Sequence, residues 1–99
     1  MLYKGLDNII KGEIKMGYIR AHIRLNSARE ANDFVSKMNH DGTANRYIIE
    51  DYNGIERANA RSLFGVIYAL SDYAEQMFLV NETDDGNFPS FIDEYRVIG

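Results

Sequence analysis

The feature that most constrains the fold is a change of hydrophobic period within residues 18–38. Residues 18–25 (YIRAHIRL) alternate between apolar and polar side chains, as in a strand with one buried face and one wet face. The S-x-x-E pattern of a helix N-terminus follows at Ser27 and Glu30. Apolar residues then recur at the spacing of a buried helical stripe, at Ala31, Phe34, Val35 and Met38. The sequence therefore predicts a strand followed closely by a helix that packs against the sheet.

The polar half of this first strand is predicted to be exposed. Its side chains are Tyr18, Arg20, His22 and Arg24, which alternate with apolar residues. Because successive side chains of a strand point to opposite faces, these four residues share one face of the sheet. We expect that face to be open to solvent or covered by a partner.

Further elements follow along the chain. Runs 44–52 and 55–60 flank Asn53-Gly54, the preferred sequence of a two-residue type I′ hairpin turn. Ser62 is a candidate N-cap for a helix over residues 62–71, and residues 75–82 match another strand. Pro89 suits the first turn of a last helix.

The order of these elements predicts the fold class. It is strand–helix–strand–strand–helix–strand–helix, and helices that return to one face of a mainly antiparallel sheet give a two-layer α+β sandwich. We expect a four-stranded sheet with three helices on one face, formed by residues 17–99. Residues 1–16 are then an N-terminal extension, in which the apolar spacing over residues 1–12 is that of a short helix.

Composition narrows the class of protein. The 99 residues include no cysteine, which excludes disulfides, thiolate metal sites and a cysteine nucleophile. The N-terminus lacks a signal-peptide pattern, and no apolar run reaches the roughly 18 residues of a membrane span, so we expect a cytoplasmic protein with no membrane partner. The two histidines and scattered carboxylates form no metal-binding pattern, and we expect neither metal nor cofactor.

The charge is unevenly distributed along the chain. The net charge is −4, with a balance of +4 over residues 1–29 and −8 over residues 30–99. Proteins that bind duplex DNA usually carry a basic surplus, so this balance argues against direct binding of nucleic acid. The basic N-terminal third could still face an anionic partner, although solvated surface charge explains it equally well.

Three segments resemble the histidine-containing phosphocarrier family of the bacterial sugar phosphotransferase system, the HPr proteins. Residues 27–35 (SAREANDFV) resemble the H-T/A-R-P-A-x-x-F-V motif of its first helix, residues 51–54 (DYNG) its E-Y-N-G hairpin, and residues 60–66 (ARSLFGV) its K-S-I/L-M/F-G-V motif. The resemblance covers residues 18–95 and implies the HPr-like open-faced sandwich.

The departures from the family pattern bear on function. The family carries its phosphoryl group on a histidine where this chain has Ser27, and Glu30 stands in place of the motif's proline, whereas Arg29 is kept. A serine hydroxyl needs an adjacent base to act as a nucleophile, and no histidine adjoins Ser27 in the sequence. The resemblance therefore implies a degenerate member that is not an enzyme and acts as a regulatory or protein-binding module.

The resemblance also assigns candidate site residues. Ser62 matches the family's regulatory phosphorylation serine, and the family's fold would bring Ser27, Arg29, Arg61 and Ser62 into one patch for an anion or partner. A surface of Leu63, Phe64 and Ile67 matches the region where family members meet protein partners, and Tyr52, Tyr68 and Tyr73 are candidate exposed anchors. Helix capping by the two serines and core packing by the apolar residues are the alternative explanations.

Two other functions remain open at this point. One is an active phosphocarrier that uses His22 or another group. The other is an unrelated small α+β domain that binds an anion on the strand face of Arg20, His22 and Arg24. The sequence leaves the partner's identity and the oligomeric state open.

Overall fold

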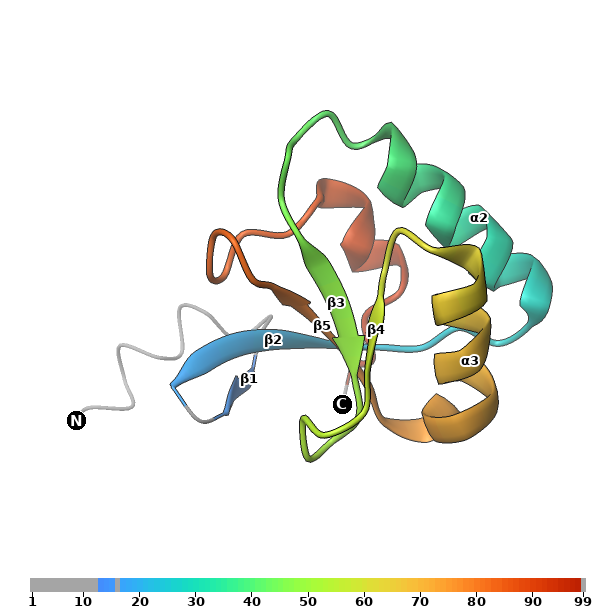
Figure 1. Ribbon diagram of the computed structural model, residues 1–99, viewed down its shortest axis with the longest axis horizontal. Helices are drawn as coiled ribbons and strands as arrows, with labels where there is room; N and C mark the ends of the chain where they lie inside the picture. The colour runs from blue at the N-terminus through green and yellow to red at the C-terminus, as the bar shows by residue number, and fades with distance from the viewer. Residues whose placement is uncertain (1–12, 16, 99) are drawn as a thin grey trace.

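The computed structural model describes residues 13–15 and 17–98, which form an α+β fold in which helices cover one face of an antiparallel sheet (Figure 1). The strands are β1 (Glu13–Lys15), β2 (Tyr18–Ile23), β3 (Tyr47–Glu50), β4 (Arg57–Asn59) and β5 (Met77–Asn81). The helices are α2 (Ala28–His40) and α3 (Leu63–Tyr73), with short 3-10 helices η2 (Ala74–Gln76) and η3 (Ser90–Glu94). In the described part of the chain the sheet has five strands in the order β1-β2-β5-β3-β4.

The predicted strand–helix–strand–strand–helix–strand order is confirmed from β2 to β5, but the predicted third principal helix is wrong. Within residues 13–15 and 17–98 there are two α-helices, and the segment after Pro89 is the 3-10 helix η3. The chain becomes extended again directly after η3, because Tyr95 O accepts a hydrogen bond from Arg24 N and Val97 N donates to His22 O. Because residues 95–97 are bonded to the end of β2 in this way, they cannot extend the helix beyond η3.

The predicted N-terminal extension contributes to the sheet. Residues 13–15 form β1, which pairs antiparallel with β2, and Ile14 lies opposite Ile19. Gly17 between the two strands has φ +85, a conformation that favours glycine. The expected helix over residues 1–12 lies outside the described residues.

The hairpin predicted at Asn53-Gly54 is confirmed, although its turn is wider than the predicted two-residue type I′ turn. β3 pairs with β4, and residues 51–56 connect them. The Asp51 carboxylate accepts bonds from Ile55 N at 2.8 Å and Glu56 N at 3.3 Å, while Asp51 O accepts from Gly54 N. Asp51 thus stabilises a longer loop, in which Gly54 keeps the expected positive φ of +73.

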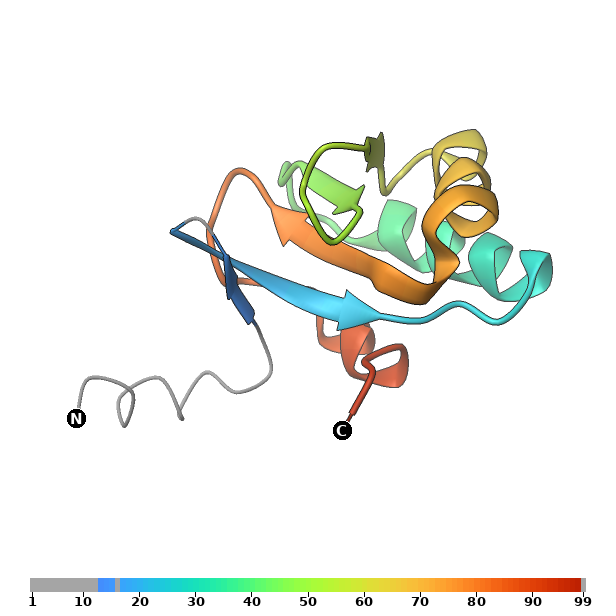
Figure 2. The same ribbon diagram turned by 90° about the horizontal axis from the view of Figure 1, so that it is seen from below.

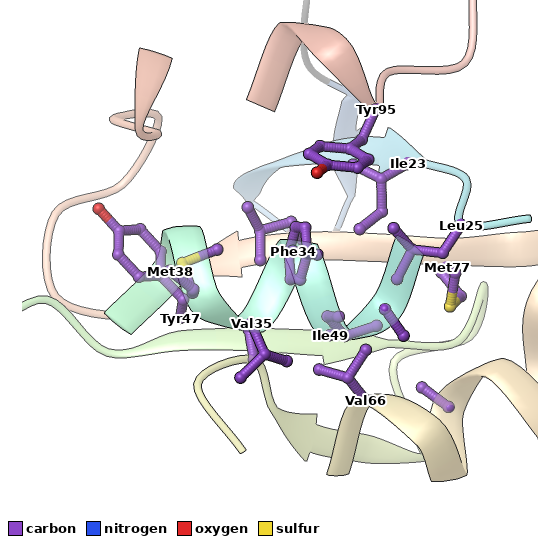
Figure 3. Close-up of a cluster of buried hydrophobic side chains, with 14 of the residues drawn as sticks. Ile23, Leu25, Phe34, Val35, Met38, Tyr47, Ile49, Val66, Met77 and Tyr95 are labelled. Carbon is purple, nitrogen blue, oxygen red and sulfur yellow. The ribbon is translucent and has the colours of Figure 1, made fainter. Parts of the chain in front are cut away.

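The hydrophobic core lies between the sheet and the helices, around Phe34 (Figure 3). The Phe34 ring makes edge-to-face contacts with Phe91 and Tyr95, at centroid distances of 6.1 and 5.3 Å. The predicted stripe of α2 is confirmed, because all four of its residues are buried: Ala31, Phe34, Val35 and Met38. The short helix η3 therefore packs on α2 through aromatic rings.

The opposite face of the sheet carries a buried ion pair, which contradicts the prediction that this face is open along all of β2. Arg20 and Glu50 are both 0% exposed, and Arg20 Nη1 lies 3.2 Å from Glu50 Oε2. The Arg20 guanidinium also lies 3.8 Å from the centroid of the Phe78 ring and donates to Tyr52 O at 2.8 Å. The hairpin loop and Phe78 thus cover Arg20, and of the four residues on this face of β2 and the segment after it only Arg24 is exposed.

A chain of ion pairs extends from this buried pair towards the edge of the sheet. Glu50 Oε1 lies 3.2 Å from Arg57 Nε, and Arg57 Nη1 lies 2.6 Å from Glu82. Glu82 in turn pairs with Arg46, and Tyr18 donates its hydroxyl hydrogen to Glu50. Opposite charges thus meet across this face of the sheet, and Glu50 and Arg57 are directly opposite each other on the neighbouring strands β3 and β4, a cross-strand pair of the kind that stabilises a sheet.

Candidate functional site

The N-terminus of α2, where the family resemblance places the phosphoryl-carrying histidine, is closed by a serine and a carboxylate. Ser27 is the N-cap as predicted, and its Oγ accepts a hydrogen bond from Glu30 N at 3.1 Å. Glu30 Oε1 accepts from Asn26 N at 2.9 Å, one residue before the position that a capping box uses. The Glu30 carboxylate therefore occupies the end of the helix dipole that would attract a phosphoryl group.

The two histidines lie away from this helix end. The His22 ring stacks on Phe78 at a centroid distance of 4.5 Å, and its Nε2 is 3.3 Å from Glu75 O. His40 is the last residue of α2, with Nδ1 2.7 Å from Ser36 O. Among the described residues neither imidazole hydrogen-bonds to Ser27, so neither histidine is placed to act as a general base there.

The structure does not bring Ser27, Arg29, Arg61 and Ser62 together as the resemblance implies. Arg61 lies at the far end of α2, where its guanidinium donates to Met38 O and to Asn45 O and forms an ion pair with Asp41 at 3.2 Å. The thirteen residues of α2 separate this end from Ser27 by about 18 Å at the usual helical rise. Because α3 begins beside the C-terminus of α2, Arg61 binds one carbonyl at the end of α2 and two carbonyls of the segment that follows it, instead of joining an anion site.

Replacing Arg61 by methionine should lower the free energy of unfolding by about 1–2 kcal/mol, since three carbonyls and Asp41 lose a charged donor. The hydrogen bond from the Thr43 hydroxyl and then that from Arg61 hold the pKa of Asp41 below its ordinary value. The ionised Asp41 carboxylate therefore stabilises the fold at any pH above that ordinary pKa, and this contribution is lost as the pH falls through the lowered pKa. In R61M the Asp41 pKa should rise, as measured by NMR titration. Arg29→Met is the matched control: Arg29 is exposed and its side chain bonds to no other described residue, so a similar loss there would contradict this role of Arg61.

Ser62 is the N-cap of α3, as predicted. Its Oγ accepts a hydrogen bond from Gly65 N at 3.1 Å, and the residue is half-buried. Gly65 allows α3 to lie close to β4, because a Cβ there would be 3.0 Å from Asn59 O. The capping role accounts for Ser62 structurally, and its phosphorylation stays a prediction of the resemblance.

Of the three residues predicted to form the docking surface, Leu63 and Phe64 are exposed and Ile67 is partly buried. Phe64 is 88% exposed and Leu63 is 39% exposed, whereas Ile67 packs against the core. Tyr68, one turn after Phe64, is 50% exposed. Tyr73 is half-buried and donates its hydroxyl hydrogen to Ile49 O, so it belongs to the core edge.

Carboxylates gather around Tyr68, a feature that the sequence pattern did not indicate. The Tyr68 hydroxyl donates to Glu56, from the β3–β4 connection, and lies 3.3 Å from Asp72 on α3. The hydrogen bond to Glu56 raises the Tyr68 pKa to about 12. The nearness of Asp72 raises the pKa of Glu56, because two carboxylates side by side resist ionisation.

Two hollows offer further candidate sites; their cations Arg46, Arg57 and Arg96 are already paired, whereas Arg24, which lines the second hollow, is exposed. One, of about 580 Å³, has Val80 and Tyr18 in its lining, and its Arg46 and Arg57 share Glu82. The other, of about 480 Å³, lies beside the N-terminus of α2 and contains Glu30 together with Arg96, which pairs with Asp93 at 2.8 Å. The anion-binding face predicted from Arg20, His22 and Arg24 is not favoured either, because Glu50 already neutralises Arg20.

Within residues 13–15 and 17–98 no three His, Cys, Asp or Glu side chains gather closely enough to hold a metal ion. No helix in the same residues has the length and apolarity to cross a bilayer. Comparisons of the chain with protein-family models, with curated proteins and with solved structures gave no match.

Proposed function

We propose that this chain is an HPr-like regulatory module that binds a protein partner through α3 and does not carry a phosphoryl group on histidine. The order of elements from β2 to β5, with a serine-capped helix after β2 and another after β4, agrees with the arrangement that the resemblance implies. The observation that carries the proposal is Phe64, a large apolar side chain held in solvent on the first turn of α3.

Phe64 is not part of the hydrophobic core that the described residues form. It is 88% exposed, whereas Val66 and Ala69 of the same helix are fully buried. Single exposed apolar residues are common, but here Leu63 and Tyr68 adjoin Phe64 and extend the apolar area. Aromatic side chains of this kind supply much of the binding energy in protein interfaces.

The chemistry at the start of α2 favours binding over phosphotransfer. Ser27 Oγ is used as a cap, no imidazole is bonded to it within the described residues, and the Glu30 carboxylate lies beside it. A serine ester would also be too stable to pass the group on, unlike the phosphoramidate of a neutral histidine. A module whose α2 N-terminus is built in this way can bind a partner through α3 without transferring a phosphoryl group.

The proposal is tested with the purified phosphoenolpyruvate-dependent donor enzyme and the HPr-type serine kinase. We expect no acid-labile label on this chain from radiolabelled phosphoenolpyruvate. Ser27→His should gain little label while the Glu30 carboxylate repels the phosphoryl group, and adding Glu30→Gln should increase it. In NMR titrations with each of the two proteins, amide shifts should cluster at residues 62–68, and Phe64→Ala should weaken the complex about tenfold.

Ile98→Ala is the matched control for Phe64→Ala, because Ile98 is an apolar side chain that is equally exposed (89%) and lies outside α3. It should leave binding unchanged. Label transfer at the rate of a genuine HPr would overturn the absence of phosphotransfer. Failure of both proteins to bind, or shifts confined to another face, would overturn the docking role of α3.

A further inference from the structure

The exposed apolar residues of α3 border a group of carboxylates that face no cation among the described residues. We call Leu63, Phe64 and Tyr68, together with Glu56 and Asp72, the α3 surface. Phe64 and Tyr68 are one helical turn apart and so lie on the same side of α3. The Tyr68 hydroxyl donates its hydrogen to Glu56 and lies 3.3 Å from Asp72, which places the acidic groups directly beside the apolar ones. Figure 2 shows α3 on the outside of the helical layer.

Within residues 13–15 and 17–98, no lysine or arginine is paired with the carboxylates of the α3 surface. Residues 63–73 include Asp72 and no lysine or arginine. The two arginines closest before α3 in the sequence have other partners: Arg57, in β4, pairs with Glu50 and Glu82, and Arg61 pairs with Asp41. The raised pKa of Glu56 beside Asp72 agrees with this concentration of negative charge.

We infer that the partner of the α3 surface presents a basic face with an apolar pocket: the pocket receives Phe64, and lysine or arginine side chains beside it pair with Glu56 and Asp72. This inference rests on the proposed function and adds the chemistry of the partner. Complementary charges around an apolar contact suppress wrong partners and speed association. A second copy of this chain fits less well, because a symmetric contact would place one acidic rim against the other.

The probe is a designed amphipathic helical peptide with leucine at i, i+3, i+4 and i+7 and lysine beside this stripe; in its matched peptide glutamate replaces every lysine. We expect the lysine peptide alone to bind, with NMR shifts over residues 63–72 and weaker affinity at higher salt. Phe64→Ala should weaken binding about tenfold. Glu56→Gln and Asp72→Asn should each weaken it about threefold.

Ile98→Ala and Glu94→Gln are the matched controls, since Ile98 is exposed and Glu94 pairs with Lys37. They should leave the affinity unchanged. Equal binding of both peptides, binding of neither, or equal losses in controls and α3 variants would each overturn the inference. So would a dimer in sedimentation that Phe64→Ala dissociates, because the α3 surface would then be covered by a second copy.

These outcomes are separable from failure of the proposed function. If Phe64→Ala weakens both peptides alike, docking on α3 stands and the basic character of the partner is wrong. If the donor enzyme labels the chain, phosphotransfer is present whatever the peptides show.

Discussion

Replacing Glu50 by glutamine should lower the free energy of unfolding by about 3 kcal/mol, because it removes the carboxylate charge that is paired with the buried Arg20 guanidinium. Both side chains are fully buried, and 3.2 Å separates Arg20 Nη1 from Glu50 Oε2. Glu50 also accepts from Tyr18 and Arg57, so three groups lose a charged acceptor at once. Urea denaturation followed by circular dichroism measures the change.

Glu82→Gln is the matched control, because Glu82 pairs with Arg57 and Arg46 but is 24% exposed. Its loss should cost less than about 1 kcal/mol. The double variant Arg20→Met with Glu50→Leu should recover part of the stability lost in Glu50→Gln, since apolar groups of similar size can replace a buried pair. If Glu50→Gln costs no more than Glu82→Gln, the buried pair does not hold the outer face of the sheet together.

Phe34→Ala should lower the free energy of unfolding by about 3–5 kcal/mol, the usual cost of removing a fully buried aromatic ring. Phe34 is 0% exposed and contacts the rings of Phe91 and Tyr95. Its removal opens a cavity and also takes away the contact that fixes η3 on α2. Hydrogen exchange should therefore rise over residues 90–97 as well as in α2.

Phe64→Ala makes the same chemical change on the exposed side of α3 and serves as the control. Because Phe64 is 88% exposed, the change should alter stability by less than about 0.5 kcal/mol. This comparison also shows whether loss of binding in Phe64→Ala can be separated from loss of folding. Equal destabilisation by the two variants would contradict the placement of Phe34 in the core and Phe64 outside it.

The buried ion pair changes what the outer face of the sheet can do. A face lined by unpaired arginine and histidine could bind an anion, but here Arg20 is neutralised by Glu50 and His22 stacks on Phe78. An exposed apolar surface is instead found on α3, which lies beside β4 (Figure 1). Partner binding through α3 is therefore better supported than ligand binding on the sheet.

Local patterns in the sequence were sufficient to predict much of the fold. The alternation over residues 18–25, the caps at Ser27 and Ser62, and the stripe from Ala31 to Met38 all correspond to observed elements. These features depend on bonds between residues a few positions apart and on the burial of one face, so a single stretch of chain determines them. Gly54 was predictable for the same reason, because its positive φ is a local requirement.

Contacts between distant segments decided the rest. Arg20 looked like a surface residue until Glu50, thirty residues later, was placed beside it across β5. Arg61 lies outside the predicted anion patch because α3 starts next to the C-terminus of α2. The predicted third helix is only a short 3-10 helix because residues 95–97 pair with the end of β2. The acidic rim of the α3 surface likewise joins Glu56 to Asp72. A charged side chain has the same local pattern whether it meets water or a partner, and only the packing of strands and helices determines which of the two it meets.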